Sequence, residues 1–166
     1  MDRLAKKSNK MEQRISAYEK GQNAMRVLYG FGAYLSKSSL EQPLLNLIYY
    51  RVSQVNGCAY CLDMHSKDLR AEGETEQRLY VLDAWRETPL YSDRERAALA
   101  WAEAVTKITN ANVPDDVYEE ARQQFSEEEL IDLTLAVIAI NSYNRVNIAF
   151  RIQGGSYKVG EHAVHA

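Results

Sequence analysis

Apolar residues recur at helical spacing near the start of the chain. In the stretch 22–36, QNAMRVLYGFGAYLS, the residues Met25, Leu28 and Leu35 fall on one face of a helix. A helix with one apolar face buries that face against the rest of a domain. The pattern therefore predicts an amphipathic helix over 22–36.

A second helix is predicted to follow and to end at a sharp turn. The sequence SLEQ at 39–42 matches a capping box, Pro43 suits a first helical turn, and the apolar run LLNLIYYRVSQV continues from there. Asn56-Gly57 supplies a helix stop. A third helix is therefore expected over 58–73.

Further helices complete the predicted fold, which is all-α. A short helix is predicted over 76–85, and a capping sequence at Ser92 opens the next one. Pro114 begins another, and the sequence SEEE at 126–129 caps a long apolar helix, LIDLTLAVIAINSYNRVNIAF. The β-branched residues of this run are compatible with a strand, but its length and its cap favour a helix.

The sequence predicts a single domain. The chain has 166 residues, enough for a sizeable core, and it contains no internal repeat or low-complexity linker. Residues 1–10 are polar and basic and are expected to be a disordered extension, so the predicted domain covers 11–166. The segment between Leu130 and Ile140 is apolar nearly all round, which indicates burial on several sides and favours a homo-oligomer.

Charge and hydropathy argue against two classes of partner. The formal net charge is −3 and no basic stripe with interleaved aromatic residues is present, so no nucleic-acid partner is expected. No apolar run approaches the roughly 18 residues that span a bilayer, so no membrane is expected either. The opening MDRLAKKSNKMEQR precedes no apolar segment of a secretory signal. We therefore expect a cytoplasmic protein, whose thiols stay reduced.

Both cysteines lie in the stretch NGCAYCLDMHSKDLRAEG. Cys58, Cys61 and His65 stand at positions i, i+3 and i+7 of the predicted helix and share one face. The positive end of the helix dipole stabilises a thiolate there, and His65 can exchange a proton with Cys61. A thiolate that attacks a peroxide becomes a sulfenic acid, which a second thiol converts to a disulfide.

Two other interpretations of these residues remain open. The cysteines can simply be packing residues, because free Cys is among the most buried residue types. Alternatively, Cys58, Cys61 and His65 are zinc ligands, with His162 or His165 as the fourth. Zinc ligands usually form two separated pairs, and these two histidines lie in a short polar tail, so a redox pair with no metal or other cofactor is favoured.

Other polar residues are weaker candidates. Tyr60, between the cysteines, either donates a hydrogen bond or only packs, and Asp63 and Asp68 are expected to be solvated. Arg145 is expected to form an ion pair or to line a pocket. Polar residues that interrupt the last apolar helix need partners if they are buried; they are Asn141, Tyr143, Asn144 and Arg145.

The motif VSQVNGCAYCLDMH, with LLNLIYYR before it and INSYNRVNIAFRI near the end, resembles the alkyl hydroperoxidase D-like (AhpD-like) branch of the carboxymuconolactone decarboxylase superfamily. The resemblance covers roughly residues 15–152. It implies an all-α, AhpD-like fold assembled as a homotrimer or homohexamer. It also implies thiol-based peroxide reduction or disulfide exchange without metal or haem. The electrons would come from a dihydrolipoamide- or thioredoxin-type donor.

The resemblance also implies roles for individual residues. Cys61 would attack the peroxide, Cys58 would resolve the intermediate, His65 would relay protons, and Tyr60 would belong to the same site. The order of the two thiols stays open, because the helix dipole favours Cys58 as the more acidic thiol whereas His65 stands closer to Cys61.

One position departs from the family pattern. The proton relay of the family usually begins at a glutamate twelve residues before the first Cys, where this chain has Asn46. An amide can orient His65 or hold a water, but it cannot take a proton, and loss of a general base costs about 10²–10⁴ in rate. Glu41 is expected to lie off the Asn46 face, so it does not replace the missing carboxylate.

We therefore predict a thiol-dependent peroxidase or disulfide oxidoreductase that reduces small organic hydroperoxides or hydrogen peroxide through Cys58 and Cys61. The alternative is a non-catalytic binding module on the same fold, in which these thiols form a switchable disulfide. Asn46 is the feature that keeps this alternative open.

Overall fold

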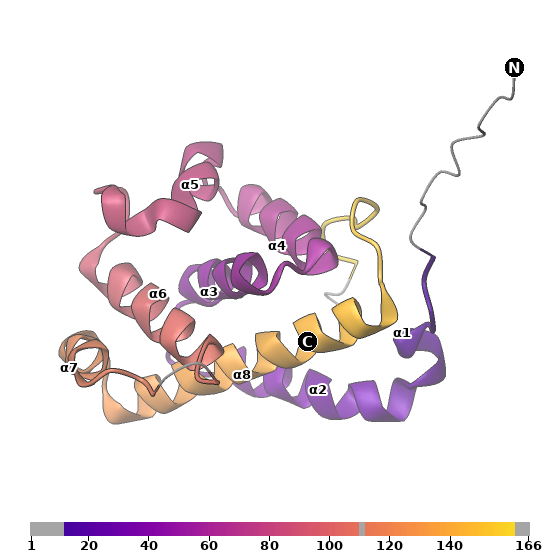
Figure 1. Cartoon of the computed structure of the whole chain (residues 1–166), viewed down its shortest axis with the longest axis horizontal. Helices are drawn as coiled ribbons and strands as arrows, with labels where there is room; N and C mark the ends of the chain where they lie inside the picture. The colour runs from indigo at the N-terminus through magenta and orange to yellow at the C-terminus, as the bar shows by residue number, and fades with distance from the viewer. Residues whose placement is uncertain (1–11, 110–111, 162–166) are drawn as a thin grey trace, which may run out of the picture.

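The computed structural model describes residues 12–109 and 112–161, and in that part of the chain all regular secondary structure is helical (Figure 1). The prediction of an all-α fold is confirmed. The expected disordered extension over residues 1–10 lies outside the described residues, as do His162 and His165. The helices are α1 (Ala17–Lys20), α2 (Gln22–Leu35), α3 (Gln42–Asn56), α4 (Ala59–Ala71), α5 (Glu76–Val81), the 3₁₀ helix η1 (Leu82–Glu87), α6 (Asp93–Thr106), α7 (Asp115–Gln124) and α8 (Glu127–Phe150).

The helix caps predicted at Ser92 and Ser126 are confirmed, and the capping box predicted over 39–42 is not. At the starts of α6 and α8, the hydroxyls of Ser92 and Ser126 accept from the backbone N–H of the glutamate three residues on, and each serine's own backbone N–H donates to the carboxylate of that glutamate. The box predicted over 39–42 is wrong, since the N-cap of α3 is Glu41 and no side chain caps this end. The Glu41 carboxylate instead pairs with Arg94 of α6, which is a tertiary contact.

The helix predicted over 76–85 is split in the structure. The α-helical part ends at Val81, and a 3₁₀ helix follows with a non-helical residue at Ala84. This kink accompanies a buried tertiary bond, in which the indole Nε1 of Trp85 donates to Oε1 of Glu103 at 2.9 Å. Arg51 of α3 donates to the same carboxylate oxygen at 2.7 Å. The polar cluster therefore holds η1, α3 and α6 together.

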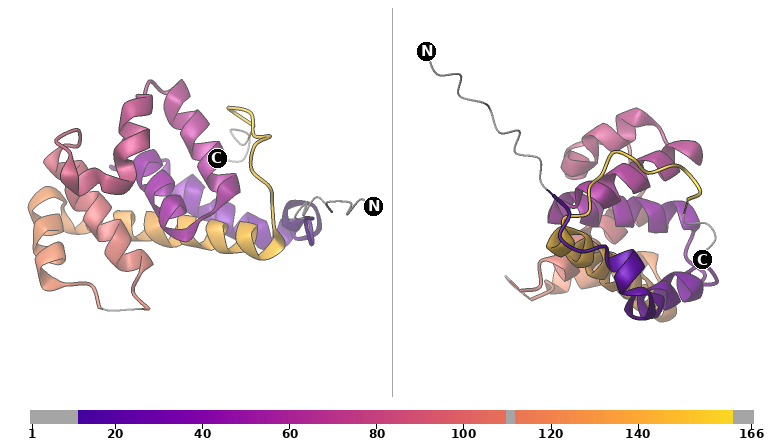
Figure 2. Two further views of the ribbon diagram at one scale, coloured as in Figure 1. Left: turned by 45° about the horizontal axis from the view of Figure 1, so that its top comes forward. Right: turned by 90° about the vertical axis from the view of Figure 1, so that its right-hand side faces the viewer.

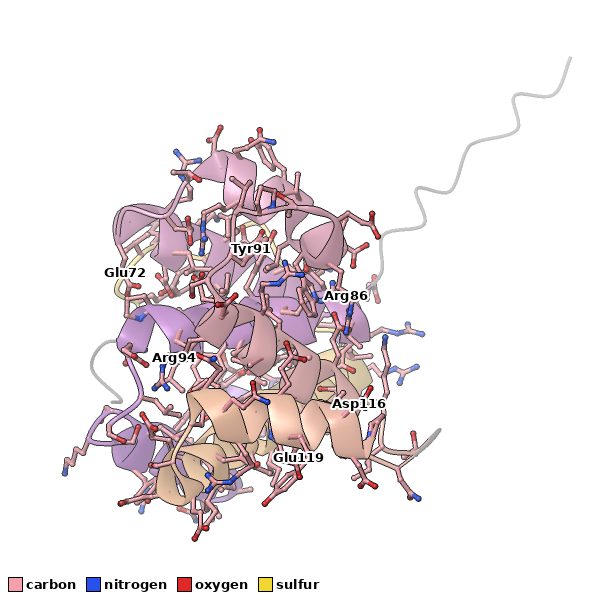
Figure 3. The ribbon with its side chains drawn as sticks, turned by 90° about the vertical axis from the view of Figure 1, so that its left-hand side faces the viewer. Glu72, Arg86, Tyr91, Arg94, Asp116 and Glu119 are labelled. Atoms are coloured by element: carbon pink, nitrogen blue, oxygen red, sulfur yellow. The ribbon has the colours of Figure 1, made fainter. Side chains whose placement is uncertain are left out.

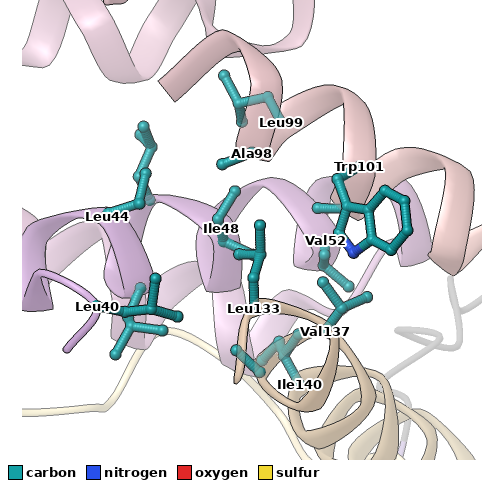
Figure 4. Packing of buried hydrophobic residues seen from close by; sticks show 14 of the residues in the cluster. Leu40, Leu44, Ile48, Val52, Ala98, Leu99, Trp101, Leu133, Val137 and Ile140 are labelled. Atoms are coloured by element: carbon teal, nitrogen blue, oxygen red, sulfur yellow. The ribbon is translucent and has the colours of Figure 1, made fainter. Parts of the chain in front are cut away.

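Helix α3 lies at the centre of the molecule, with α4, α6 and α8 packed around it. Figure 4 shows Ile48 and Val52 of α3 between side chains of α6 and α8, among them Leu99 and Leu133. All four of these side chains have 0% exposure. Because α3 is fixed on three sides, the turn at its carboxyl end is held in one position.

The long helix α8 runs beneath α3, and α2 lies along it (Figures 1 and 2). The segment predicted to be buried all round is buried only in part within this chain. Within this segment, Leu133 and Val137 are fully buried, but Ile131 and Ile138 are 68% and 45% exposed. An apolar strip of α8 thus faces outward from the described part of the molecule.

The chain after α8 turns back along α4, as the yellow segment in Figure 2 shows. Asp63 of α4 accepts from the backbone N–H groups of Gly155 and Tyr157, at 2.8 and 3.2 Å. The Tyr157 hydroxyl donates to Asp68 at 2.9 Å. The expectation that Asp63 and Asp68 are merely solvated is therefore wrong, because both anchor this returning segment. Within the described ranges, no helix has the length and apolarity that crossing a bilayer requires.

Candidate active site

The turn between α3 and α4 places the two cysteines. Gly57 ends α3 in the left-handed conformation, with φ of 68°, which a residue without Cβ adopts easily. The backbone N–H of Cys58 donates to the carbonyl of Ser53 at 3.1 Å, and Cys58 is at the same time the N-cap of α4. The helix stop predicted at Asn56-Gly57 is confirmed, and it brings the thiols to the start of α4.

Both thiols are buried and reduced. Their exposures are 1% for Cys58 and 0% for Cys61, and one hydrogen bond joins the two Sγ atoms at 2.9 Å. This bond from Cys61 lowers the pKa of Cys58 to about 7, while it and burial raise the pKa of Cys61 above its ordinary value. The two thiols therefore titrate as a coupled pair in which Cys58 is the more acidic.

A pocket of about 200 Å³ opens on the Cys61 side of the pair. Its lining carries no carboxylate, guanidinium or ammonium group, and five tyrosines dominate it. The lining residues are Tyr18, Tyr29, Gly32, Tyr49, Tyr60, Cys61, Met64, His65, Ala139, Ile140, Tyr143 and Asn147. A pocket of this composition suits a small, neutral, apolar molecule.

Of the residues singled out from the sequence, Cys61, His65 and Tyr60 meet at this pocket. The His65 ring is 8% exposed and packs on the Tyr49 ring, with 5.4 Å between centroids. Burial raises the pKa of Tyr60 to about 12, so its hydroxyl keeps its proton at neutral pH. Cys58 is not part of the lining and lies behind Cys61.

Asn46 lies away from the pocket lining. Its Nδ2 donates to Oε2 of Glu72 at 2.7 Å, and its Oδ1 accepts from Gln42 at 3.0 Å. Glu72 stands at the carboxyl end of α4, beside the start of α3 (Figure 3). Glu41 forms an ion pair with Arg94, in keeping with the expectation that it does not replace the missing glutamate. The amide of Asn46 is thus committed to partners other than the thiol pair.

Helix α8 contributes a row of buried asparagines that the sequence only partly revealed. Asn56 of α3 donates to Asn141 and Asn144, at 3.0 and 2.9 Å. Asn147, one turn further along, donates to Sγ of Cys61 at 3.2 Å, and its Oδ1 accepts from the Tyr18 hydroxyl at 2.9 Å. The sequence interpretation missed Asn147 and Tyr18. The three-residue spacing of the asparagines was the available signal.

Arg145 does not have the roles expected for it. The side chain is exposed and donates to the carbonyl and to Oδ1 of Asn141, on its own helix. Among the described residues it forms no ion pair and does not line the pocket. It therefore braces the α8 asparagine row from outside.

The zinc interpretation gains no support from the described residues. No group of three or more His, Cys, Asp and Glu side chains within them is arranged to hold a metal ion. His162 and His165, the proposed fourth ligands, fall outside the ranges that the structure describes.

The chain is similar in sequence to several known proteins. Residues 23–104 match the carboxymuconolactone decarboxylase family. The uncharacterized protein YdfG of Bacillus subtilis is 45% identical over 139 residues, which are 84% of this chain and 95% of that protein. The uncharacterized protein YnjA of Escherichia coli is 30% identical over 116 residues, 70% of this chain and 63% of that one.

Solved structures with a similar fold belong to related proteins. A protein of unknown function from Agrobacterium tumefaciens, named after the antioxidant defence protein AhpD, superposes with a TM-score of 0.84 at 40% identity, over 88% of this chain and all of that one. A variant of the debrominase Bmp8, in complex with 2,3,4-tribromopyrrole, has a TM-score of 0.74 at 20% identity, over 84% and 74% of the two chains. The chain belongs to the AhpD-like branch of the carboxymuconolactone decarboxylase superfamily.

Proposed function

We propose that this protein is a thiol-dependent peroxidase that reduces small organic hydroperoxides. The observation that carries the proposal is the position of a buried, hydrogen-bonded thiol pair at the wall of an apolar pocket of about 200 Å³. The lining has no charged group that would bind an anionic substrate, so the organic part of the substrate is neutral and compact. Hydrogen peroxide would use the same thiols with little help from the pocket.

The proposed reaction begins at Cys61, whose sulfur faces the pocket. Cys58 first loses its proton to solvent, which later returns one proton to the alkoxide. The proton of Cys61 then passes to the Cys58 sulfur 2.9 Å away, and the Cys61 thiolate attacks the outer peroxide oxygen. The O–O bond breaks, Cys61 becomes a sulfenic acid, and the alkoxide takes a proton by way of His65. Cys58 then attacks the sulfenic sulfur, and its proton leaves with the hydroxide as water. Two thiols and one hydroperoxide give one disulfide, one alcohol and one water.

The cycle needs an external dithiol to reduce the disulfide. A dihydrolipoamide- or thioredoxin-type protein of the cytoplasm has the required chemistry. We also propose a homotrimer or homohexamer, in which the exposed strip of α8 with Ile131 and Ile138 packs against another copy. Nucleic acid and membrane have no part in the proposed function.

A second candidate is a redox-switchable binding module that turns over no substrate. It is favoured by Asn46, which stands where the family pattern has a glutamate and whose amide is bonded to Glu72. In this case Cys58 and Cys61 would still form a disulfide, but its formation would alter binding to a partner.

A single-turnover experiment tests the proposal. The reduced, metal-free protein is mixed with one equivalent of an aromatic hydroperoxide, and free thiols are followed by stopped flow beside the Cys58→Ser and Cys61→Ser variants. We expect both thiols to disappear within seconds, Cys58→Ser to stop at a sulfenic acid, and Cys61→Ser to be inert. Thiol loss no faster than that of an exposed free thiol would reject the peroxidase proposal and favour the redox-switchable binding module.

Two further arms of this experiment separate substrates. Hydrogen peroxide is expected to react more slowly than the aromatic hydroperoxide, because it gains no contact with the five tyrosines. A brominated pyrrole serves as a probe of dehalogenation, since the Bmp8 complex has the same fold. Release of bromide faster than peroxide consumption would redirect the assignment to that chemistry.

A further inference from the structure

A buried amide touches the sulfur that faces the pocket. Nδ2 of Asn147 lies 3.2 Å from Sγ of Cys61, and the Asn147 side chain is only 2% exposed. The two residues are 86 positions apart in the sequence and come from α8 and α4. Both line the pocket, so any molecule that reaches the sulfur also lies near this amide.

The orientation of the amide is fixed by a second residue. The Tyr18 hydroxyl donates to Oδ1 of Asn147 at 2.9 Å, and this bond keeps Nδ2 turned toward the sulfur. Tyr18 lies in α1, and that segment is tied to the end of α8. The backbone and the guanidinium of Arg14 donate to the carbonyls of Phe150 and Ala149, at 3.0 and 3.1 Å.

We propose that Asn147 is a further catalytic residue, whose N–H bond stabilises negative charge on Cys61 at the moment of attack. Tyr18 is a positioning residue that holds the amide in the donating orientation. The catalytic part of this inference rests on the proposed thiol chemistry, whereas the effect of Asn147 on the Cys61 thiolate does not.

The charges around the sulfur explain why such a donor matters. Cys58 is the more acidic thiol of the pair, so attack by Cys61 requires negative charge to move to Cys61 across the shared hydrogen bond. The other titratable groups that face the pocket are His65 and the five tyrosines, and burial keeps the tyrosines protonated by raising their pKa values. No cation lines the pocket among the described residues. Hydrogen bonds from the amides of Asn147 and Asn144 both lower the pKa of Cys61, and of the two only Asn147 lines the pocket where the peroxide would lie.

A titration of Cys61 alone tests the inference without any substrate. In the Cys58→Ser background, the ultraviolet absorbance of the thiolate against pH reports the pKa of Cys61. We expect Asn147→Ala to raise that pKa by about one unit, the effect of losing a hydrogen bond to a charged group. Asn147→Asp keeps the shape but places a carboxylate beside the sulfur, so the rise should be larger. Tyr18→Phe should give a smaller rise.

The matched control is Asn141→Ala, on the same helix. Asn141 is also buried, but it donates to Thr106 and accepts from Asn56, and neither bond involves a thiol. This variant should lose stability and leave the Cys61 titration unchanged. Circular dichroism of each variant checks that the fold is kept.

The outcomes separate this inference from the proposed function. With both cysteines present, Asn147→Ala should also slow single-turnover peroxide consumption about tenfold at fixed pH. A shift of the Cys61 pKa without peroxide chemistry would retain the role of the amide and reject the peroxidase. An unchanged pKa in both Asn147 variants, or an equal shift in Asn141→Ala, would overturn the inference.

Discussion

The amide of Asn46 donates to the carboxylate of Glu72 across 2.7 Å, from the first turns of α3 to the carboxyl end of α4. A carboxylate is thus present beside the position where the family pattern has one, but it comes from a different helix. Glu72 is exposed, whereas the Asn46 side chain is 7% exposed. The relationship makes the asparagine a structural link between the two helices that carry the active-site turn.

Replacing Asn46 by the glutamate of the family pattern should therefore destabilise the fold. In Asn46→Glu, two carboxylates meet where a hydrogen bond was, and we expect a loss of about 1–3 kcal/mol in the free energy of unfolding at neutral pH. Urea denaturation measures this loss. The double variant with Glu72→Gln should recover most of it, because the neutral amide can donate to the new carboxylate. No recovery in the double variant would contradict the link.

The thiol pair should show its asymmetry in alkylation kinetics. Because the bond from Cys61 lowers the pKa of Cys58 to about 7, the reaction of the reduced protein with iodoacetamide should rise through a midpoint near that pH. In Cys61→Ala the bond is lost, so the midpoint should move upward toward that of an ordinary thiol. Mass spectrometry of the alkylated peptides identifies the residue. A label on Cys61, whose sulfur lines the pocket, would agree with the proposed order of attack, whereas a midpoint at the pKa of an ordinary thiol would contradict the lowered pKa of Cys58.

The buried carboxylate of Glu103 should make stability sensitive to acid. Burial raises its pKa, but bonds from Trp85, Arg86 and Arg51 outweigh burial and hold the pKa below its ordinary value. The stabilisation is therefore complete above the pKa of the unfolded chain and is lost as pH falls through the folded pKa. Glu103→Gln should cost about 1–3 kcal/mol at neutral pH, because it removes the charge that pairs with the buried Arg51, which keeps its ion pair with Asp83.

This prediction is checked by denaturation at several pH values. The difference between the parent protein and Glu103→Gln should shrink in acid, where the parent carboxyl is also neutral. A difference that is constant across pH would mean that packing, rather than charge, accounts for the loss.

Adding one methyl group at Gly154, in the segment after α8, should displace this segment from α4. A Cβ at position 154 would lie 2.5 Å from the carbonyl oxygen of Ala59, so Gly154→Ala has no room beside the start of α4. We expect faster hydrogen exchange in 152–161 and a changed thiol reactivity. Gly30→Ala is the matched control, since a Cβ there meets nothing within 4 Å, and it should stabilise α2 by about 0.5–1 kcal/mol.

The exposed strip of α8 should determine assembly. Ile138→Asp places a charge in the proposed interface, and we expect the assembled protein to dissociate toward monomers in light scattering. Tyr80→Ser, at a site on α5 that is 71% exposed, should leave the mass unchanged. A monomeric parent protein would contradict the proposed oligomer outright.

Local signals in the sequence predicted most of the helices, because they depend on neighbouring residues. Ser92 and Ser126 cap helices through glutamates three residues on, and Gly57 stops α3 by its own conformation. Where tertiary contacts compete, the local signals failed. Arg94 takes the carboxylate of Glu41 at the start of α3, and the kink of η1 follows the bond from Trp85 to Glu103.

The chemistry was predictable only within one helix. The spacing of Cys58, Cys61 and His65 is a property of α4 and follows from the sequence alone. The contact of Asn147 with Cys61 and that of Asn46 with Glu72 join segments 86 and 26 residues apart. Such pairs depend on how whole helices pack, which hydrophobic periodicity does not specify.

The turn between α3 and α4 at Gly57 holds the two thiols so close together that oxidation changes the structure little. The Sγ atoms already lie 2.9 Å apart, and a disulfide needs about 2 Å, so closing the bond moves each sulfur by less than the length of a C–H bond. In the reduced protein the backbone N–H of Cys58 is bonded to the carbonyl of Ser53, and so small a movement of the sulfurs does not require this bond to break. The backbone would therefore change little between the reduced and oxidised protein. This suits repeated turnover better than a redox switch, which needs a conformational change that a partner can recognise.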